Sequence, residues 1–370
     1  MADWTRTTIH RGDAIERVLC VTGDVDGDGD DEVLIGGRTG TMGLHLLDHA
    51  SDGQWRHHLI DSDYDRMDAG GWLVDLDGDG RLDFLAGPDR ANNLLTWWRN
   101  AGEPATPWTR RVICEMPGRQ SHDQIAADLD GDGRLEVYFW NQGAETLFVA
   151  RVPDDPAVEP WPDVQPVAEG VREEGLAIAD VDGDGRAELI AGQSWYRCTG
   201  AGRYERQVYA EGFVSPRIAA ADLRGHGQLE IVIAEGDASI YAKRLGRLAR
   251  LTPGDDVSKP WAMQVLHEEL EDPHSIIVAD FDGDGRPDVF IGELGDPNGA
   301  HHHPPAQRIY WNCGGELVEQ IIDAGVGTHE AKLLRVGGRT MIVGKPYRNV
   351  RDAIERDDEV DAVHVWAAEA

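Results

Sequence analysis

The sequence has few cysteines and no long apolar run. Its 370 residues include four widely spaced cysteines, Cys20, Cys114, Cys198 and Cys313, with no C-x-x-C pair. This pattern indicates neither a disulfide framework nor a zinc ribbon, and we expect buried thiols. No segment approaches the roughly 20 consecutive apolar residues of a membrane-spanning helix. The N-terminal MADWTRTTIHRGD lacks the apolar core of a signal peptide, so we expect a cytoplasmic protein.

Basic residues are also scarce. The chain has 35 Lys and Arg against 68 Asp and Glu, a net charge of −33, and 41% hydrophobic residues. This composition is typical of a folded, acidic protein. So negative a charge repels phosphate backbones and anionic lipid, so we expect neither a nucleic-acid nor a membrane partner. The sequence leaves the oligomeric state open.

An acidic, glycine-rich motif recurs along the chain. The string D-x-D-G-D-G-x-x-[DE] occupies residues 24–32, 75–83, 128–136, 180–188 and 280–288, and a degenerate copy, DLRGHGQLE, occupies 222–230. Short apolar runs flank each copy, which predicts a strand, a tight turn and a second strand. A third apolar segment, such as 94–100 or 146–152, and a fourth, such as 108–113 or 204–209, follow most hairpins. Four strands in each period of about 50 residues indicate propeller blades.

A seventh unit lacks the acidic loop but keeps the same frame. Residues 329–344 align with 274–292, and AVHVW at 362–366 supplies a third strand. The N-terminal WTRTTI at 4–9 matches the missing fourth strand. We therefore predict an all-β fold, a single seven-bladed β-propeller over residues 1–370. Its seventh blade comprises 329–367 plus 4–9, which closes the ring and removes free sheet edges.

The acidic loops are predicted to bind structural calcium. Carboxylates at alternate positions share one concave side, and hard oxygen ligands suit Ca²⁺. The expected ligands in the five intact loops are Asp24, Asp26, Asp28 and Glu32; Asp75, Asp77, Asp79 and Asp83; Asp128, Asp130, Asp132 and Glu136; Asp180, Asp182, Asp184 and Glu188; and Asp280, Asp282, Asp284 and Asp288. In the degenerate loop Arg224 and His226 replace two ligands, so we expect a fixed cation in place of the metal. The alternative is that the loops are polar turns without an ion.

The repeats resemble the FG-GAP/VCBS propellers of integrin α-subunits and many microbial proteins. In that family the strand before the acidic loop is innermost, so its first residue opens at the upper mouth of the central channel. The residues six positions before each loop, and at the start of the seventh unit, are Val18, Ala69, His122, Glu174, Pro216, His274 and His329. Because the inner strands converge on the axis, we expect the three histidines and the glutamate to approach one another.

Three imidazoles with an open position suit one catalytic divalent metal, Zn²⁺, Mn²⁺ or similar. We predict His122, His274 and His329 as its ligands. The alternative is that each histidine caps a strand and bonds a neighbouring blade.

Loops after the second strands carry groups that suit a sugar, since ring faces stack on aromatics while hydroxyls bond to polar groups. The predicted substrate-binding residues are Asp89, Arg90, Trp140, Asn141, Tyr196, Arg197 and Glu293. Trp195 lies in the same loops and could equally pack between blades. His301, His302 and His303 form a Gly/Pro-rich insertion, which we interpret as a lid.

Three segments carry a second resemblance. EEGLAIADVDGDGRAELIAGQSWYR, DPHSIIVADFDGDGRPDVFIGE and GTHEAKLLRVGGRTMIVGKPY resemble the propeller portion of fungal aldos-2-ulose dehydratases. The resemblance implies metal-dependent dehydration of a keto-sugar. The 370 residues are expected to form one propeller without the additional domains of those enzymes, so substrate and reaction could differ.

We therefore predict a metal-dependent carbohydrate lyase or dehydratase that performs β-elimination on a keto-sugar or keto-glycoside. Glu174 is the first candidate for the base, followed by Glu173, Asp123 and Glu330, while Lys345 and Tyr347 could assist the leaving oxygen or the enolate. One alternative is a non-catalytic carbohydrate-binding or adhesion propeller. Another is a metal-dependent sugar isomerase or hydrolase.

Overall fold

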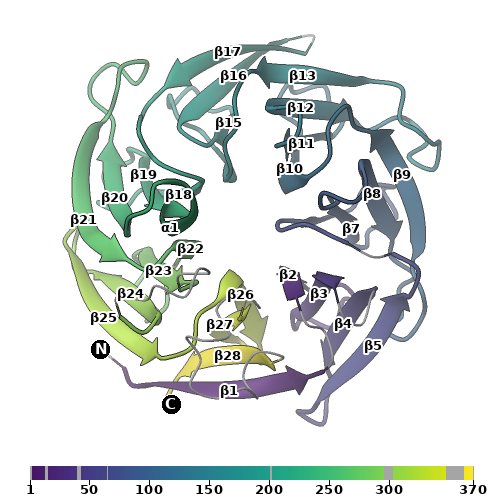
Figure 1. The fold of residues 1–370 in the computed structure, drawn as a ribbon, viewed down its shortest axis with the longest axis horizontal. Coiled ribbons are helices and arrows are strands. Elements are labelled where there is room, and N and C mark those ends of the chain that lie inside the picture. Colours follow the sequence, from purple (N-terminus) through teal and green to yellow (C-terminus); the bar gives the residue numbers. More distant parts are fainter. Residues whose placement is uncertain are drawn as a thin grey trace.

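The seven predicted blades are present, and they form a closed ring (Figure 1). In the computed structural model, residues 2–12, 16–39, 43–64, 66–200, 202–295, 303–346 and 362–369 are described. Each blade is a four-stranded antiparallel sheet. The single short helix of these residues is α1 (Ala238–Tyr241), and none of their helices is long and apolar enough to cross a membrane.

The blades follow the chain in order, each from the inner strand outward. Blade 1 contains β2 (Glu16–Gly23), β3 (Glu32–Thr39), β4 (Leu44–His49) and β5 (Trp55–Asp61). Blade 2 contains β6 (Trp72–Val74), β7 (Asp83–Ala86), β8 (Leu94–Arg99) and β9 (Thr109–Glu115). Blade 3 contains β10 (Ser121–Ala127), β11 (Glu136–Asn141), β12 (Thr146–Arg151) and β13 (Val164–Glu169). Blade 4 contains β14 (Leu176–Ala179), β15 (Glu188–Ala191), β16 (Ser194–Gly200) and β17 (Arg203–Val208).

Blades 5 to 7 complete the circle. Blade 5 contains β18 (Pro216–Ala221), β19 (Glu230–Glu235), β20 (Gly246–Thr252) and β21 (Ala262–Leu270). Blade 6 contains β22 (Pro273–Ala279), β23 (Asp288–Glu293), β24 (Ala306–Asn312) and β25 (Leu317–Ala324). Blade 7 contains β26 (His329–Val336), β27 (Arg339–Lys345), β28 (Ala362–Ala368) and, as its outer strand, β1 (Trp4–Arg11). The predicted closure by the N-terminal strand is therefore confirmed, with Trp4 opposite Ala368.

Apolar side chains fill the spaces between neighbouring blades. Leu19, Phe84 and Trp98, for example, share one buried cluster between blades 1 and 2. Val181 and Ile231 do the same between blades 4 and 5. The strands are apolar because the sheet of each blade packs against the sheets of its two neighbours. It also holds the inner strands close to the axis, where the first residue of each can reach its counterparts.

The acidic loops join the first strand of a blade to the second, as predicted. The closing carboxylate folds back on its own loop: Glu32 accepts a hydrogen bond from the backbone N of Val25 at 2.8 Å. Gly27 and Gly29 adopt left-handed φ values of 83° and 96°, which glycine adopts without steric cost. The motif thus forms a tight turn that its own closing carboxylate stabilises.

Candidate functional site

Residues at or near the start of four inner strands line one cavity. The cavity has a volume of about 330 Å³, and its lining includes His122, Glu174, His274 and His329. They come from blades 3, 4, 6 and 7. The structure thus places together the four side chains that the shared sequence position predicts to converge. Their roles as ligands stay predictions.

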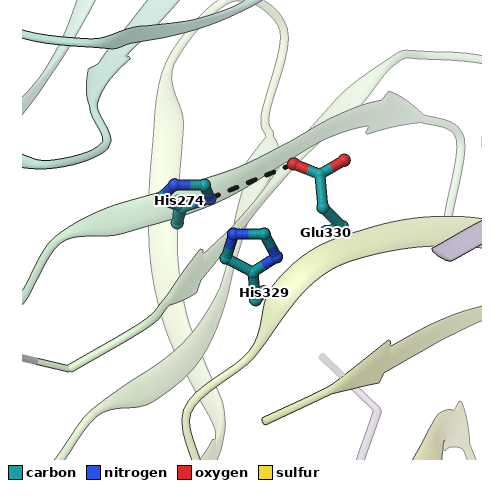
Figure 2. A group of neighbouring side chains, drawn as sticks. All are labelled: His274, His329 and Glu330. Atoms are coloured by element: carbon teal, nitrogen blue, oxygen red, sulfur yellow. Dashed lines mark ion pairs between the residues drawn. The ribbon is translucent and has the colours of Figure 1, made fainter. Parts of the chain in front are cut away.

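Two of the three histidines lie close to the carboxylate of Glu330. The rings of His274 and His329 lie 4.3 Å apart between centroids, with 26° between their planes. Nδ1 of His274 lies 4.0 Å from Oε1 of Glu330, and Figure 2 shows this group. One ligand atom from each of the three residues lies within 4.8 Å of the others, and all three residues are buried. Two imidazoles and a carboxylate are a donor set that a divalent transition metal accepts.

The pKa values of this pair favour the form that binds metal. Burial, aided by Arg217, holds the pKa of His274 well below its usual range. Burial and the neighbouring Lys345 do the same for His329. Both rings are therefore neutral at pH 7, which metal binding by imidazole requires.

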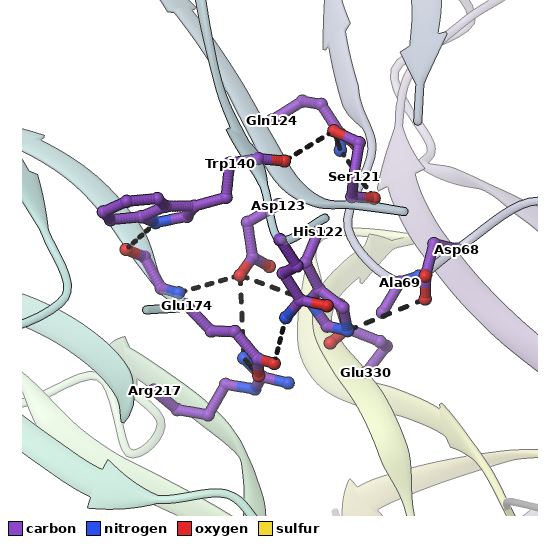
Figure 3. Close-up of polar contacts among 12 residues, drawn as sticks. Asp68, Ala69, Ser121, His122, Asp123, Gln124, Trp140, Glu174, Arg217 and Glu330 are labelled. Atoms are coloured by element: carbon purple, nitrogen blue, oxygen red, sulfur yellow. Dashed lines mark hydrogen bonds and ion pairs between the residues drawn. The ribbon is translucent and has the colours of Figure 1, made fainter. Parts of the chain in front are cut away.

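His122 has a different environment from the other two histidines (Figure 3). Its Nδ1 lies 3.4 Å from Asp123, and its Nε2 lies 3.7 Å from Asp68. Burial alone would lower the pKa of His122, but Glu174, Asp123 and Asp68 outweigh it and raise the pKa to about 9. A pKa near 9 favours the protonated ring at neutral pH, so His122 differs from the pair formed by His274 and His329.

A buried arginine that the sequence motifs do not predict lies at the centre of the site. Nη1 of Arg217 lies 2.7 Å from Oε2 of Glu174, and its Nη2 lies 2.8 Å from Nε2 and 3.3 Å from Nδ1 of His274. Arg217 directly follows Pro216 at the start of β18. The sequence position shared by the blades selects Pro216 in blade 5, whereas the charged side chain of the site belongs to the next residue, Arg217.

Two of the predicted base candidates are engaged in other contacts. Asp123 accepts a hydrogen bond from the backbone N of Gly175 at 2.8 Å. Burial raises its pKa, but Arg217 and His122 outweigh that effect and hold it below the usual range. Glu173 accepts a hydrogen bond from the backbone N of Gln193 at 2.6 Å and is not among the cavity-lining residues. Neither carboxylate is among the residues that line this cavity, and their roles as bases stay predictions.

Glu174 and Asp237 are the carboxylates that line the cavity beside His274. Glu174 accepts a hydrogen bond from Gln142 through one oxygen and pairs with Arg217 through the other. Asp237 lies 3.6 Å from Nε2 of His274. Burial and the charge of Glu174 raise the pKa of Asp237, which suits proton transfer near neutral pH. Asp237 was not predicted, because it lies after β19, outside the motifs.

The backbone is left-handed at two of the site's acidic residues. Asp123 has φ 52° and Glu330 has φ 59°. The equivalent positions in blades 2 and 4 are glycines, Gly70 with φ 97° and Gly175 with φ 81°. A non-glycine residue in this conformation costs about 1–3 kcal/mol and is most often found at functional sites. Glycine would adopt this backbone conformation without the steric cost. The presence of a carboxylate at both positions therefore favours a role for the two side chains in the site.

The lining of the cavity also includes charged and apolar residues away from the histidines. Asp89 and Arg90, both predicted, line it together with Arg38 and Gln120. Arg90 donates to Gln120 Oε1 at 2.9 Å through Nε. Ile240, Leu294 and the half-exposed Tyr241 line it as well. These residues thus offer both charged groups and an aromatic face to a polar ligand.

Five predicted substrate-binding residues do not reach the lining of this cavity, so their role in binding a sugar stays a prediction. Trp140 and Tyr196 belong to the core between blades 3 and 4. Asn141 accepts a hydrogen bond from the backbone N of Ala144. Arg197 contacts Asp182 in the acidic loop, and Glu293 is buried against Arg308 at 2.8 Å. Four of these side chains are buried, and that of Arg197 extends to the acidic loop of its own blade.

Of the remaining predicted residues, some lie near the site and others lie outside the described parts of the chain. Lys345 is buried, and its Nζ donates to the backbone O of His329 at 2.8 Å and lies 3.2 Å from Nδ1 of that ring. It therefore supports His329. Tyr347, His301 and His302 lie outside the described residues, whereas His303 lies 3.8 Å from Glu293.

The acidic loops hold carboxylates close enough for a shared cation. Ligand atoms of Asp128, Asp130, Asp132 and Glu136 lie within 4.8 Å of one another, as do those of Asp24, Asp26 and Glu32 and those of Asp75, Asp77 and Asp83. Burial, together with the neighbouring aspartates, raises the pKa of Glu32 to about 8. Such crowding is relieved by a divalent cation. The chemistry of this donor set fits Ca²⁺.

Arginines also approach these loops. Arg151 pairs with Asp132 at 3.1 Å, and Arg99 pairs with Asp79 at 3.1 Å. In the degenerate loop Arg224 lies 3.5 Å from Glu230, which is the fixed cation that the sequence predicts there. Calcium in the intact loops stays a prediction, because the arginines provide part of the same neutralisation.

Comparisons with known proteins support the repeat and the fold. A family described as FG-GAP-like repeat matches residues 75–139 and 128–191. Solved structures with similar folds include BBS1N in complex with ARL6DN, with 10% identity, a TM-score of 0.60, and coverage of 100% of this chain and 98% of that one. Another is the exotype rhamnogalacturonan lyase YesX, with 14% identity, a TM-score of 0.52, and coverage of 99% and 72%. The N-terminal domain of Nup159 has 10% identity, a TM-score of 0.51, and coverage of 99% and 96%.

These likenesses show the fold alone, since the identities are low and the three proteins differ in kind. No curated protein sequence matches the chain. The resemblance to aldos-2-ulose dehydratases is not tested by these comparisons.

Proposed function

Starting from a seven-bladed propeller with FG-GAP-like repeats, we propose that the protein is a metal-dependent carbohydrate lyase that acts on a keto-sugar or keto-glycoside. The observation that carries this proposal is the meeting in one cavity of three imidazoles with the carboxylates of Glu174 and Asp237. The pKa directions, raised for His122 and Asp237 and lowered for His274 and His329, support it. A β-elimination needs a base for the carbon-bound proton and an acid for the leaving oxygen, held together away from bulk water. The fold likeness to YesX, a lyase by name, is compatible with this reaction class.

His274, His329 and Glu330 are the residues proposed to hold the metal. Nδ1 of His274 is the atom that faces Glu330. On His329, Lys345 lies beside Nδ1, so Nε2 is the nitrogen proposed to bind. When bound there, a divalent ion would polarise the substrate carbonyl and acidify the neighbouring C–H bond.

Asp237 and His122 are proposed to move the protons. Asp237 accepts the proton from the carbon next to the carbonyl, and the electrons of that C–H bond form the new double bond as the C–O bond breaks. His122, protonated at neutral pH because its pKa is about 9, donates a proton to the departing oxygen. Glu174 is less suited to act as the base, because both of its oxygens are already engaged by Gln142 and Arg217.

Several other lining residues are proposed to bind and orient the sugar. Tyr241 offers an aromatic face for a sugar ring, and such faces pack against the apolar side of a pyranose. Arg38, Arg90 and Gln120 offer donors for hydroxyl or carbonyl oxygens. Calcium in the acidic loops is proposed to be structural.

The test is turnover of a panel of keto-sugars and keto-glycosides by the purified protein, followed by ultraviolet absorbance of the conjugated product. His274→Ala should lose both turnover and one transition-metal ion while keeping the circular dichroism spectrum and the bound calcium. His267→Ala, which changes a histidine of the outer strand β21, is the matched control. Full turnover by His274→Ala would refute the proposal.

A second variant separates the metal from the base. Asp237→Asn should lower kcat by about 10²–10⁴-fold, the usual contribution of a positioned base, and should retain the metal. An isomerised or hydrolysed product would place the same site in another reaction class. Sugar binding without any product would favour the non-catalytic propeller.

A further inference from the structure

Three histidines meet on the outer side of the ring, far along each blade from the inner strands that form the cavity. Nδ1 of His45, on β4, lies 2.8 Å from Nε2 of His57, on β5. The ring of His57 lies 4.7 Å from that of His10, on β1, and 4.9 Å from that of His45, between centroids. None of the three belongs to the repeat motif or to the cavity lining.

The sheet register explains why these side chains meet. In blade 1, His45 pairs with Leu59, so His57, two residues before Leu59, lies on the same face of the sheet as His45. His58 lies on the opposite face, where it approaches Asp48 at 3.6 Å. Adjacent histidines of one strand therefore have different surroundings.

The third histidine arrives from another blade. β1 pairs with β28 and is the outer strand of blade 7, but its C-terminal end, which carries His10, lies beside β5 of blade 1 (Figure 1). The cluster therefore spans the seam where the ring closes. It joins the strand that completes the last blade to the outer strands of the first.

We propose that His10, His45 and His57 form a binding site for a divalent transition metal, with Zn²⁺ as the expected ion. The bound ion links the outer strand of blade 7 to blade 1. Imidazole nitrogens are the ligands that borderline-soft metals prefer over calcium. The 2.8 Å between the nitrogens of His45 and His57 is shorter than the roughly 3.3 Å that separates two nitrogens each about 2.0–2.1 Å from one tetrahedral ion. A small opening of the pair admits the metal.

The burial of the three residues supports an ion that enters from solvent. His45 is buried, His10 is half-buried and His57 is exposed. One ligand is thus fixed in the sheet while another stays accessible, which provides an entry path and room for a water molecule in a further coordination position.

The site is tested by zinc stoichiometry of the full chain. The protein is stripped with a chelator, dialysed against excess Ca²⁺ to fill any calcium sites, titrated with Zn²⁺ and analysed by elemental analysis. His57→Ala should bind one zinc ion fewer than the wild type. His58→Ala, the neighbour on the opposite face, should bind the same number as the wild type.

A second variant protects the test against loss of folding. His10→Gln keeps a polar side chain on β1 and should also bind one zinc ion fewer, with an unchanged circular dichroism spectrum. The cavity metal does not affect this comparison, because it contributes equally to all of these proteins. Equal zinc content in wild type, His57→Ala and His10→Gln would overturn the proposal.

Discussion

Replacing His122 should change how the stability of the protein depends on pH. The side chain is almost fully buried, with 6% of it exposed, and it faces carboxylates on three blades, Asp68, Asp123 and Glu174. In the unfolded chain the same imidazole has a pKa near 6.5. His122→Gln removes this titration from the folded state while keeping a neutral polar side chain of similar size.

The magnitude follows from the rise of the His122 pKa from 6.5 to about 9. At ~1.4 kcal/mol per pH unit, this rise corresponds to about 3 kcal/mol of folding free energy. Because the folded-state pKa is the higher one, the stabilisation is fully present below pH 6.5. It is lost as the pH rises through about 9. The free energy of unfolding of the wild type, relative to His122→Gln, should therefore be about 3 kcal/mol larger at pH 6 than at pH 10.

The assay is urea unfolding of metal-free wild type and variant between pH 6 and pH 10, followed by tryptophan fluorescence. The difference between the two proteins cancels the titration of groups that lie far from residue 122. His58→Gln, at a partly exposed position on β5, serves as the control for the loss of a histidine outside the cavity. A difference that stays constant with pH for His122→Gln would refute the assignment of His122 as an imidazolium.

Three further predictions concern the loops, the buried arginine and the contacts between blades. Chelation should lower the unfolding temperature, and Asp24→Asn should lose one bound calcium ion by elemental analysis while Asp222→Asn loses none; equal losses would contradict the calcium prediction. Arg217→Met should destabilise the fold by about 3–5 kcal/mol in chemical denaturation, since it leaves buried carboxylates without their cation; a loss under about 1 kcal/mol would be inconsistent with the ion pair. Asn312→Ala should lower the free energy of unfolding by about 1–3 kcal/mol in the same assay. The side-chain amide of Asn312 donates to a carbonyl of the preceding blade at 2.7 Å and to a carbonyl of its own blade at 3.0 Å, and unchanged stability would argue against that bridge.

Much of the fold could be predicted because its signals are local. Each acidic loop is specified within nine residues by glycines that permit the turn and a closing acid that bonds back to the second position, as Glu32 does to Val25. The flanking apolar runs must then form paired strands. The repeat period determines the blade, and the repeated blade determines the ring.

Part of the site could be predicted for the same reason. A shared position relative to the loop places His122, Glu174, His274 and His329 at the same height on their blades, and closure of the ring brings them to one cavity. The same kind of inference does not extend to Trp140 and Tyr196, which lie in the core and not in the lining of this cavity. The face toward which a residue at the end of a strand points depends on register, which sequence spacing does not specify there.

The sequence by itself determined the repeat, the closed ring of blades and the convergence of residues that occupy equivalent positions, because short-range turn chemistry and strand patterning are sufficient for each. Only the tertiary structure decided which histidine is charged, and it alone revealed Arg217 and Asp237 among the site residues. Protonation depends on the charges within a few ångströms. For His122 these charges come from blades separated by many tens of residues along the chain, so they become neighbours only once the ring has closed.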